Sequence, residues 1–591
     1  MLNRVEHNVD FCVVGGGLAG MCAAIQAARK GKSVVLVQER PVLGGNASSE
    51  VRMWVCGAAG QNNRETGIIE EINLESLYRN PYKNYSVWDS ILYGKVHDEP
   101  NITLLLNTSV CDVDMEGGRI KTAVAWQMTT QSWHYIQAKF YADCSGDSIL
   151  APLTHAEFRL GRESSEEFDE YISVKEQDNK TMGLSCLIQA RKMDEDVEFI
   201  APSWAKKLTD EEFSRRLPRM ESNYENFWFL ELGGNRDTIG DTESIRDELL
   251  ALAFGYWDYF KNSGKFDASK WQLEFLGFLP AKRESRRMVG PHILTQREVL
   301  DGGHFEDVVA YGGWPLDDHD PDGFYSTGSG TTNTDPNSFL KGVYGIPYRC
   351  LYSANIENLF FAGRNISATH AAISSSRVMM TCAVLGQAVG EAVSVAVEYD
   401  TTPQGVYDFY MEELQQNLLR SDCFIPYFTR NVGKPTRNAD LSGCESVENL
   451  RNGIDRNNVL YGDTETGVFT EIDSKITYKF AEPQYVEIAH LVFDSDLDRN
   501  TIPGDECEKY HSMRCNIFPD SPKMHLPTTL MKDYSLLLVL ADGTEKSIDV
   551  TDNIQRMNEV VIDSLVKEIA FIPKKLWSDD KTVHLFSFDL Y

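Results

Sequence analysis

The sequence predicts a mixed α/β protein in which a mostly parallel sheet is followed by a C-terminal β-sandwich, with an α+β domain inserted between parts of the sheet. Three observations predict this fold. A glycine-rich turn joins a strand to a helix near residue 15, a second buried strand ends in Ala-Gly near residue 362, and alternating strands recur after residue 440.

The first segment, residues 10–40, reads DFCVVGGGLAGMCAAIQAARKGKSVVLVQER. Residues 11–14 form a short apolar run typical of a buried strand, and Gly15, Gly17 and Gly20 follow in the order G-x-G-x-x-G. These glycines allow a tight turn, a close approach to a pyrophosphate and close packing of helix on strand. The helix expected over residues 18–30 directs its N-terminal amides at that turn, where they favour phosphate.

A second strand, expected over residues 33–37, leads to Glu39. A carboxylate about 20 residues beyond the glycines accepts hydrogen bonds from a ribose diol and repels a 2′-phosphate. The segment therefore predicts an adenine dinucleotide without that phosphate, and both NAD and FAD satisfy this prediction.

Three further segments concern the choice between the two dinucleotides. RPVLGGNASSE supplies a second glycine pair, Gly44 and Gly45, just beyond the ribose carboxylate, and FYADCSGDS gives a strand that ends in Gly146 and Asp147. NLFFAGRNISATH, about 300 residues downstream, gives a buried strand over residues 359–361 and a polar loop that enters a helix rich in small residues.

These segments resemble those of the FAD-dependent oxidoreductases of the glutathione-reductase type, related to the flavoprotein subunits of heterodisulfide reductase and, more distantly, of succinate dehydrogenase and fumarate reductase. The matching segments span roughly residues 8–400: VVGGGLAG, LGGNASSE, ADCSGD with AEFRLGRES, RESRRMVG, GGWPLDDHDPDGF and NLFFAGRNISATH. The resemblance implies a Rossmann-like FAD-binding domain with an inserted substrate domain.

The resemblance also implies bound FAD and the residues that hold it. Relatives that attach FAD covalently carry a histidine just after the second glycine pair, where this chain has residues 46–49 as Asn-Ala-Ser-Ser, so we expect non-covalent FAD. The implied FAD contacts are Gly15, Gly17, Leu18, Ala19, Gly20, Glu39, Arg40, Gly44, Gly45, Asn46, Ser49, Val110, Cys144, Ser145, Gly146, Asp147, Gly363, Arg364, Ser376 and Val378.

Composition excludes some classes of partner and cofactor. With 57 basic and 88 acidic side chains the net charge is −31, which opposes nucleic acid and with it an RNA-modifying flavoprotein. The 12 cysteines include no C-x-x-C pair, so we expect no iron–sulfur cluster, unlike some heterodisulfide reductase relatives, and no structural zinc. Cys56, shortly after the second glycine pair, is the cysteine for which a redox role is considered.

The chain shows no basic-then-apolar leader, so we expect a cytoplasmic protein. Residues 378–397 have about the length of a membrane span, but Gln387, Glu391 and many alanines favour a buried helix.

Changes of pattern predict four segments: residues 1–155 and 346–435 form the FAD-binding domain, 156–345 the substrate domain, and 440–591 a compact β-sandwich. The segment VENLRNGIDRNN ahead of its strands resembles the entry to galactose-binding-like jelly rolls, which implies a galactose-binding-like sandwich. Gly117 and Gly118 predict a hairpin in the first segment.

Three clusters could supply catalytic groups. GFLPAKRESRRMVGPH provides Arg283, Arg286, Arg287 and His292, whose guanidinium groups suit a carboxylate or a polarised carbonyl; the alternative is an ordinary ion pair between Arg286 and Glu284.

The second cluster, GGWPLDDHDPDGF, surrounds His319 with aspartates in a proline-bracketed loop of restricted conformation. His319, oriented by a nearby aspartate, is the first choice for proton transfer, against a purely structural role. A metal site built from Asp317, Asp318, Asp320 and Asp322 is conceivable, but the spacing does not follow a calcium loop and no metal is predicted.

The third cluster contains Tyr348 and Arg349 before the returning strand, His370 in the loop beside the flavin, and Arg377. Relatives keep a histidine at the place of His370; a helix-capping or hydrogen-bonding role is the alternative for it. We thus expect an FAD-dependent oxidoreductase that acts on a small polar metabolite (a sugar, sugar acid or organic acid) by hydride transfer to or from flavin N5, with an unassigned electron acceptor. Predicted catalytic residues are His319, His370, Arg287, Tyr348 and Arg349. The alternative function is a binding or assembly protein with a structural flavin and a carbohydrate-recognising sandwich.

Overall fold

The computed structural model describes residues 2–218, 227–332, 338–462, 464–499, 501–502, 505–509, 513 and 523–591. The chain forms two compact units. The first consists of residues 1–58, 82–414 and 511–523, and the second of residues 59–81, 415–510 and 524–591.

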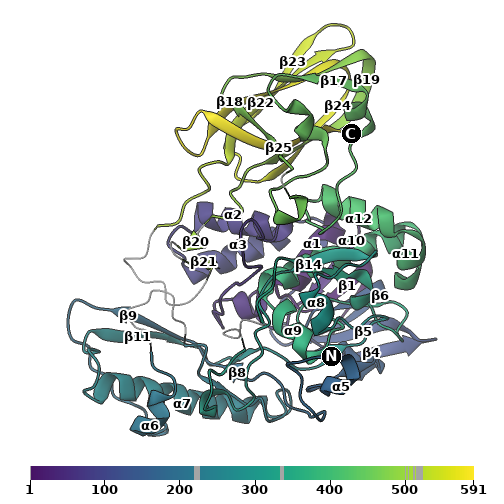
Figure 1. Ribbon diagram of the computed structural model, residues 1–591. Coiled ribbons are helices and arrows are strands. Elements are labelled where there is room, and N and C mark those ends of the chain that lie inside the picture. Colours follow the sequence, from purple (N-terminus) through teal and green to yellow (C-terminus); the bar gives the residue numbers. More distant parts are fainter. Residues whose placement is uncertain are drawn as a thin grey trace. The chain divides into compact units, whose positions relative to one another are not determined.

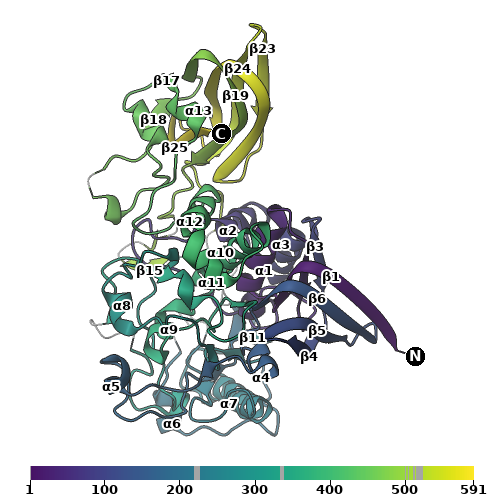
Figure 2. The same cartoon turned by 90° about the vertical axis from the view of Figure 1, so that its right-hand side faces the viewer.

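A seven-stranded sheet is the centre of the first unit (Figures 1 and 2). Its order is β3-β2-β1-β6-β5-β4, and β16 pairs with β6. The pairs of β1 with β2 and β6, of β2 with β3 and of β6 with β16 are parallel, whereas β4, β5 and β6 are joined antiparallel. The strands are β1 (Asn3–Val14), β2 (Val34–Val37), β3 (Ile102–Leu105), β4 (Thr108–Glu116), β5 (Arg119–Gln127), β6 (Ser132–Asp143) and β16 (Leu359–Phe361).

Two helices pack on each other beside this sheet: α1 (Leu18–Arg29) and α10 (Met379–Glu398). Close packing requires glycines, because a Cβ on Gly386 would lie 1.9 Å from the carbonyl oxygen of Ala19, and one on Gly390 would lie 2.3 Å from that of Ala23. Among the described residues α10 has the length and apolarity of a membrane span, yet 94% of its most apolar window is buried in the protein. The prediction of a buried helix is confirmed.

The inserted part of the first unit has its own hydrophobic core. Helix α7 (Thr242–Asn262) buries one face against β9 (Ile188–Lys192) and β11 (Trp271–Leu276), which pair antiparallel. This part also contains a sheet of three short strands, in which β8 (Leu184–Ser185) lies between β10 (Glu231–Leu232) and β12 (Ala281–Lys282).

The second unit contains an antiparallel β-sandwich in the order β18-β25-β19-β24-β22-β23, with β17 on β19. Its strands are β17 (Ala439–Ser442), β18 (Val468–Glu471), β19 (Ile476–Phe493), β22 (Met531–Leu540), β23 (Glu545–Val550), β24 (Met557–Leu576) and β25 (Thr582–Leu590). Helix α2 (Ile68–Arg79) belongs to the same unit, because Leu74 and Leu77 pack into the sandwich core. Its residues lie within 1–155, the segment that the sequence assigns to the FAD-binding domain.

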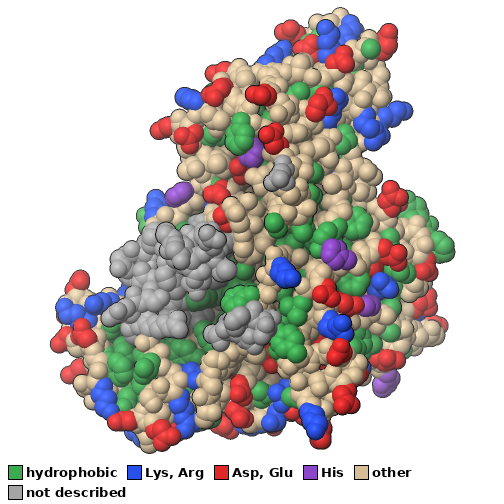
Figure 3. Space-filling view, in the orientation of Figure 1, with side chains coloured by type: hydrophobic (Ala, Val, Ile, Leu, Met, Phe, Trp, Pro, Cys, Tyr) green, Lys and Arg blue, Asp and Glu red, His purple; other side chains and the backbone are tan. Residues whose placement is uncertain are grey.

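Charged side chains of both signs are spread over the face shown in Figure 3. The acidic excess of the whole chain, −31, is thus not gathered into one patch on that face.

Candidate active site

The two glycine pairs meet in space as the sequence predicts. Gly17 forms a parallel β-bridge with Gly44, and the amide of Gly44 donates to the carbonyl of Gly16 at 2.8 Å. A Cβ on Gly45 would lie 3.3 Å from the Cα of Gly17. The backbone at the N-terminus of α1 therefore carries no side chains at Gly17, Gly44 and Gly45, and we call this stretch the glycine groove.

The other two predicted segments close around the same turn. The amide of Cys144 donates to the carbonyl of Val14 at 2.7 Å, and a Cβ on Gly15 would lie 2.3 Å from the carbonyl oxygen of Cys144. Gly363, which follows β16, faces the first turn of α1, because its Cβ would lie 3.6 Å from that of Ala19. Segments near residues 15, 45, 145 and 363 thus converge.

The groove fits a dinucleotide such as FAD. A Cβ at Gly17 would meet no atom within 4 Å, and no side chain caps the first turn of α1, so the turn leaves room for a pyrophosphate at a helix N-terminus. The hydroxyls of Ser48 and Ser376 are buried and have no hydrogen-bond partner in the described part of the chain. Buried polar groups normally have a partner, which a polar cofactor would supply here.

The structure refines the prediction for the ribose end of the groove. Gln38, not Glu39, faces the glycine turn: its side-chain oxygen accepts from the amide of Gly16 at 2.8 Å. The Glu39 side chain is 61% exposed and lies 3.5 Å from Arg40. Val110 is buried in the core cluster that also contains Val14 and Val37, at the same end of the sheet.

Polar contacts tie the predicted FAD segments to the residues before Glu284. Asp147 forms ion pairs with Lys282 at 2.6 Å and Arg364 at 2.7 Å. The carbonyl of Lys282 accepts from Asn46 and from Arg364, both at 3.0 Å. The amide of Ser49 donates to Asp89 at 3.1 Å. Residues 282–287 therefore run from the groove into the interior.

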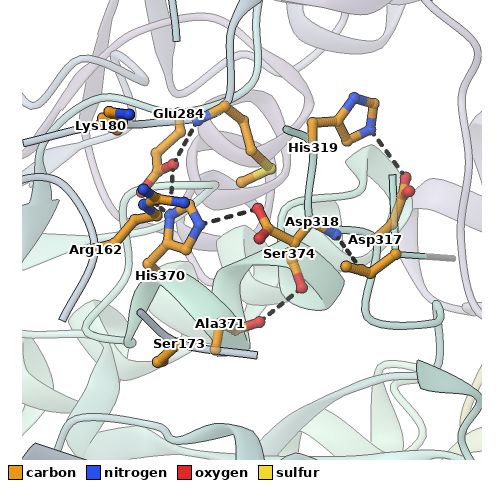
Figure 4. A network of polar contacts seen from close by, with 12 residues as sticks. Arg162, Ser173, Lys180, Glu284, Asp317, Asp318, His319, His370, Ala371 and Ser374 are labelled. Atoms are coloured by element: carbon orange, nitrogen blue, oxygen red, sulfur yellow. Dashed lines mark hydrogen bonds and ion pairs between the residues drawn. The ribbon is translucent and has the colours of Figure 1, made fainter. Parts of the chain in front are cut away.

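His370 lies at the interior end of that segment (Figure 4). It begins α9 (His370–Ser376) and is 1% exposed. Its Nδ1 lies 2.9 Å from Glu284 and its Nε2 lies 2.9 Å from Asp318. Burial alone would lower the pKa of His370, but the carboxylates of Glu284 and Asp318 outweigh burial and raise it to about 10. His370 is therefore an imidazolium that donates from both nitrogens.

His319 forms a second buried histidine–carboxylate set. Its Nδ1 lies 2.8 Å from Glu231 on β10, and its Nε2 lies 3.3 Å from Asp317. Burial opposes the charged ring, but Glu231 and Asp317 together raise the pKa of His319. Asp317 is thus an aspartate placed to orient His319, and the proton-transfer role of His319 stays a prediction. Arg377 donates to the carbonyl of Asp317 at 2.8 Å.

Arg283 and Arg287 of the first cluster are bound to internal carboxylates of the protein. Arg287, 1% exposed, donates to Glu163 at 2.7 Å, to Glu284 and to two backbone carbonyls. Arg283 lies 3.3 Å from Glu231. The expected alternative pair of Arg286 with Glu284 does not form: Glu284 pairs with Arg287, while Arg286 donates to the carbonyl of Asp147 at 3.1 Å.

Tyr348 and Arg349 are occupied elsewhere. The hydroxyl of Tyr348 is buried and donates to the carbonyl of Pro403 at 3.0 Å. Arg349 binds Asp307 through both Nε, at 2.9 Å, and a terminal nitrogen, at 3.0 Å. The structure thus gives neither residue a contact with the two histidine sets, and the substrate-orienting role expected for them gains no support.

The aspartates around His319 have separate partners. Asp317 and Asp318 serve the histidines, whereas Asp320 accepts from Ser326 at 2.7 Å and Asp322 accepts from Asn235 at 3.3 Å. Within the described residues, no group of three or more His, Cys, Asp and Glu side chains could hold a metal. Cys56 accepts at its carbonyl from the amide of Met380 at 2.9 Å, beside the start of α10.

Sequence reasoning missed three buried acids, Glu163, Glu170 and Glu231, and the role of Asp318. Glu163 accepts from the His370 amide at 2.9 Å, and Glu170 accepts from Thr369, which caps α9, at 2.6 Å. The signal for Glu163 was present, since it lies in the family-like segment AEFRLGRES. Glu231 follows an aromatic strand segment with no feature that indicates a site.

Comparison with known proteins gives a family match. A family model described as FAD dependent oxidoreductase matches residues 10–418. NADH:acrylate oxidoreductase of Vibrio harveyi is 55% identical over 42 residues, which cover 7% of this chain and 4% of that protein. The chain therefore covers only a small part of this curated relative's length.

Two solved structures match parts of this chain. A geranylgeranyl bacteriochlorophyll reductase-like protein of Thermoplasma acidophilum matches 70% of this chain and 86% of its own, with 13% identity and a TM-score of 0.31. The family 32 carbohydrate-binding module of EndoD from Streptococcus pneumoniae matches 26% of this chain and 92% of its own, with 13% identity and a TM-score of 0.18.

Proposed function

Because the chain belongs to the family of FAD-dependent oxidoreductases, we propose that it binds FAD non-covalently and oxidises or reduces a small polar metabolite, namely a sugar, sugar acid or organic acid. Bound FAD would supply the hydride acceptor or donor at N5. One observation carries this proposal: residues 282–287 link the glycine groove directly to a buried set of two histidines and their carboxylates.

The residues of the groove would hold the cofactor. The backbone around Gly17 and Gly45 leaves room for the pyrophosphate, and Gln38 is placed at the ribose end beside the turn. Lys282 and Arg364 fix the loop at Asp147, which closes the groove from the side of β6.

The buried histidine sets would orient the substrate and hold its proton. His370 keeps a proton at Nε2 and donates it to Asp318, and Glu284 fixes the opposite side of the ring. Arg287 and Glu163 hold Glu284 and the His370 backbone in place. The set can thus deliver or accept one proton at Asp318 without rearrangement.

Anaerobic titration of the purified holoprotein tests the proposal. Sugars, sugar acids and hydroxy acids are added singly and the flavin band near 450 nm is recorded; a parallel series uses chemically reduced protein and carbonyl or enoate compounds. We expect at least one compound to bleach or restore the band. If none does, and the sandwich alone binds ligands, the rival function of a binding protein with structural flavin replaces this one.

The matched variants for that titration are His370→Gln and His292→Gln. His370→Gln removes the imidazolium beside Asp318 and should abolish fast reduction of the flavin. His292→Gln changes a partly exposed histidine whose ring lies 3.0 Å from Glu298 and which is not part of the histidine sets. Equal rates in both variants would remove His370 from the reaction.

A further inference from the structure

We infer that the site takes an uncharged ligand with several hydroxyl groups, and that Asp318 is the side chain that contacts it. The inference rests on the proposed function, which places the ligand at the histidine sets. Of the three proposed classes of ligand (sugar, sugar acid and organic acid) it keeps only the uncharged one. Two independent observations carry it: the charges of the sets are already balanced, and one carboxylate oxygen at their margin is free.

The charge balance comes first. Every guanidinium and imidazolium of the sets is bound to an internal carboxylate at hydrogen-bond or ion-pair distance. The sets contain five carboxylates: Glu163, Glu231, Glu284, Asp317 and Asp318. They contain five cations: Arg283, Arg287, Arg377, His319 and His370.

A ligand carboxylate would therefore enter a buried region with no cation left to match it. An unmatched buried charge is costly, and it would also lie close to five carboxylates. The two cations at the edge of the sets, Arg162 and Lys180, do not supply a matching charge for a ligand carboxylate. Arg162 is bound to Asp178 through both Nε and a terminal nitrogen, and Lys180 is exposed, where solvent and salt screen its charge.

The free acceptor comes second. Asp318 Oδ1 accepts from His370, but Oδ2 has no partner in the described part of the chain, and the side chain is 12% exposed. His370 is 1% exposed and bonded at both ring nitrogens, so a ligand would contact Asp318 rather than the histidine. A carboxylate oxygen only accepts, and therefore selects a ligand that donates.

A second polar group without a partner lies on Arg377, the residue that binds Asp317, which is next to Asp318 in the chain. The Nε–H of Arg377 is buried without a hydrogen-bond partner. A hydroxyl group both donates and accepts, so a polyhydroxylated molecule that reaches Asp318 and Arg377 can bond to both, whereas a carboxylate cannot donate to Asp318. Matched polar contacts of this kind discriminate strongly, since a wrong ligand leaves buried groups unpaired.

Binding to the holoprotein tests the inference without turnover. Matched pairs are compared at constant ionic strength: D-glucose with D-glucuronate, D-glucitol with D-gluconate, and glycerol with glycerate. Affinity is read from the perturbation of the flavin spectrum and from the shift in unfolding temperature. We expect each neutral compound that binds to do so at least about tenfold more tightly than its acid.

Two variants locate the contact. Asp318→Asn keeps the shape but replaces an acceptor by an amide, and should weaken the neutral ligand at least about tenfold. Asp322→Asn, in the same loop but bonded to Asn235, should bind like wild type. The wild-type comparison does not depend on the folding of either variant.

The outcomes separate this inference from the proposed function. Tighter binding of the acids, absence of binding for every neutral compound, or unchanged affinity in Asp318→Asn would overturn the inference. Reduction of the flavin by acids alone would leave the oxidoreductase function in place and remove this ligand class. Neutral compounds that bind without changing the redox state of the flavin would support the ligand class and count against the proposed reaction.

Discussion

Gly17 and Gly20 lie three residues apart and serve different purposes. A Cβ on Gly20 would lie 1.8 Å from the carbonyl oxygen of Gly15, so this glycine is required by the fold. Gly17 has φ −67° and ψ 176°, which any residue adopts, and its Cβ would point into open space. The fold does not require this glycine, whereas a pyrophosphate placed there does.

The pair gives a prediction that separates cofactor binding from folding. Gly17→Ala should leave the stability of the cofactor-free protein unchanged within about 0.5 kcal/mol and weaken FAD binding, because the methyl group occupies the groove. Gly20→Ala should destabilise the protein itself by about 1–3 kcal/mol through overpacking. The 450/280 nm absorbance ratio and the unfolding temperature of the cofactor-free protein check both. Loss of stability in Gly17→Ala with normal flavin content would be the opposite result.

His370 determines how the protein responds to alkaline pH. Its pKa, ordinarily 6.5, is raised to about 10 by Glu284 and Asp318 against the effect of burial. A raised pKa means that the stabilisation is fully present below about pH 6.5 and is lost as the pH rises through about 10. The loss amounts to at most about 1.4 kcal/mol for each pH unit in this window.

We therefore predict that the unfolding temperature of wild type falls between pH 6.5 and about 10 and that His370→Gln flattens this fall. At pH 6 the variant should lose about 3–5 kcal/mol, because Glu284 loses its partner in a buried pair. Thermal unfolding at several pH values, with His292→Gln as the control, measures both effects. Parallel pH profiles for wild type and His370→Gln would refute the assignment.

At the scale of elements, the contact of α1 with α10 connects the returning chain to the cofactor groove. Gly386 packs against the carbonyl of Ala19, in the turn of α1 that borders Gly363. A larger residue there would separate the helices and displace the groove.

Substitution of two helical glycines tests this role. Gly386→Ala should destabilise the protein by about 1–3 kcal/mol and lower its flavin content, since the new methyl group meets a backbone carbonyl. Gly94 in α3 (Tyr85–His97) meets no atom within 4 Å, so Gly94→Ala should stabilise by up to about 1 kcal/mol with normal flavin content. Similar effects of the two variants on flavin content would contradict the packing argument.

The elements around the glycine motifs could be predicted from the sequence because their determinants are local. The strand expected over residues 359–361 coincides with β16, and the helix expected over residues 18–30 with α1 to within one residue. The sequence prediction named Glu39 alone for the ribose; it did not foresee that Gln38 faces the glycine turn, because that depends on how the chain leaves β2. The partners of the histidines could not be predicted from the sequence either, because Glu231 lies 88 residues from His319 and only the fold brings them together.

At the scale of the molecule, the chain divides differently from the predicted segments. The contact pattern places residues 59–81 with the sandwich unit, although they lie within the first sequence segment. Local patterns do not reveal the core into which Leu74 and Leu77 of α2 pack. Within that unit Glu70 of α2 also forms an ion pair with Arg499 at 2.7 Å.

The central claim for the first unit is that backbone segments near residues 15, 45 and 363 hold a single non-covalent FAD. The direct measurement is cofactor release: purified protein is denatured with heat or acid, the precipitate is removed, and the nucleotide in the supernatant is identified and quantified. The account predicts about one FAD for each chain. A colourless protein that releases only a nicotinamide dinucleotide, or a flavin that stays with the precipitated chain, would contradict it.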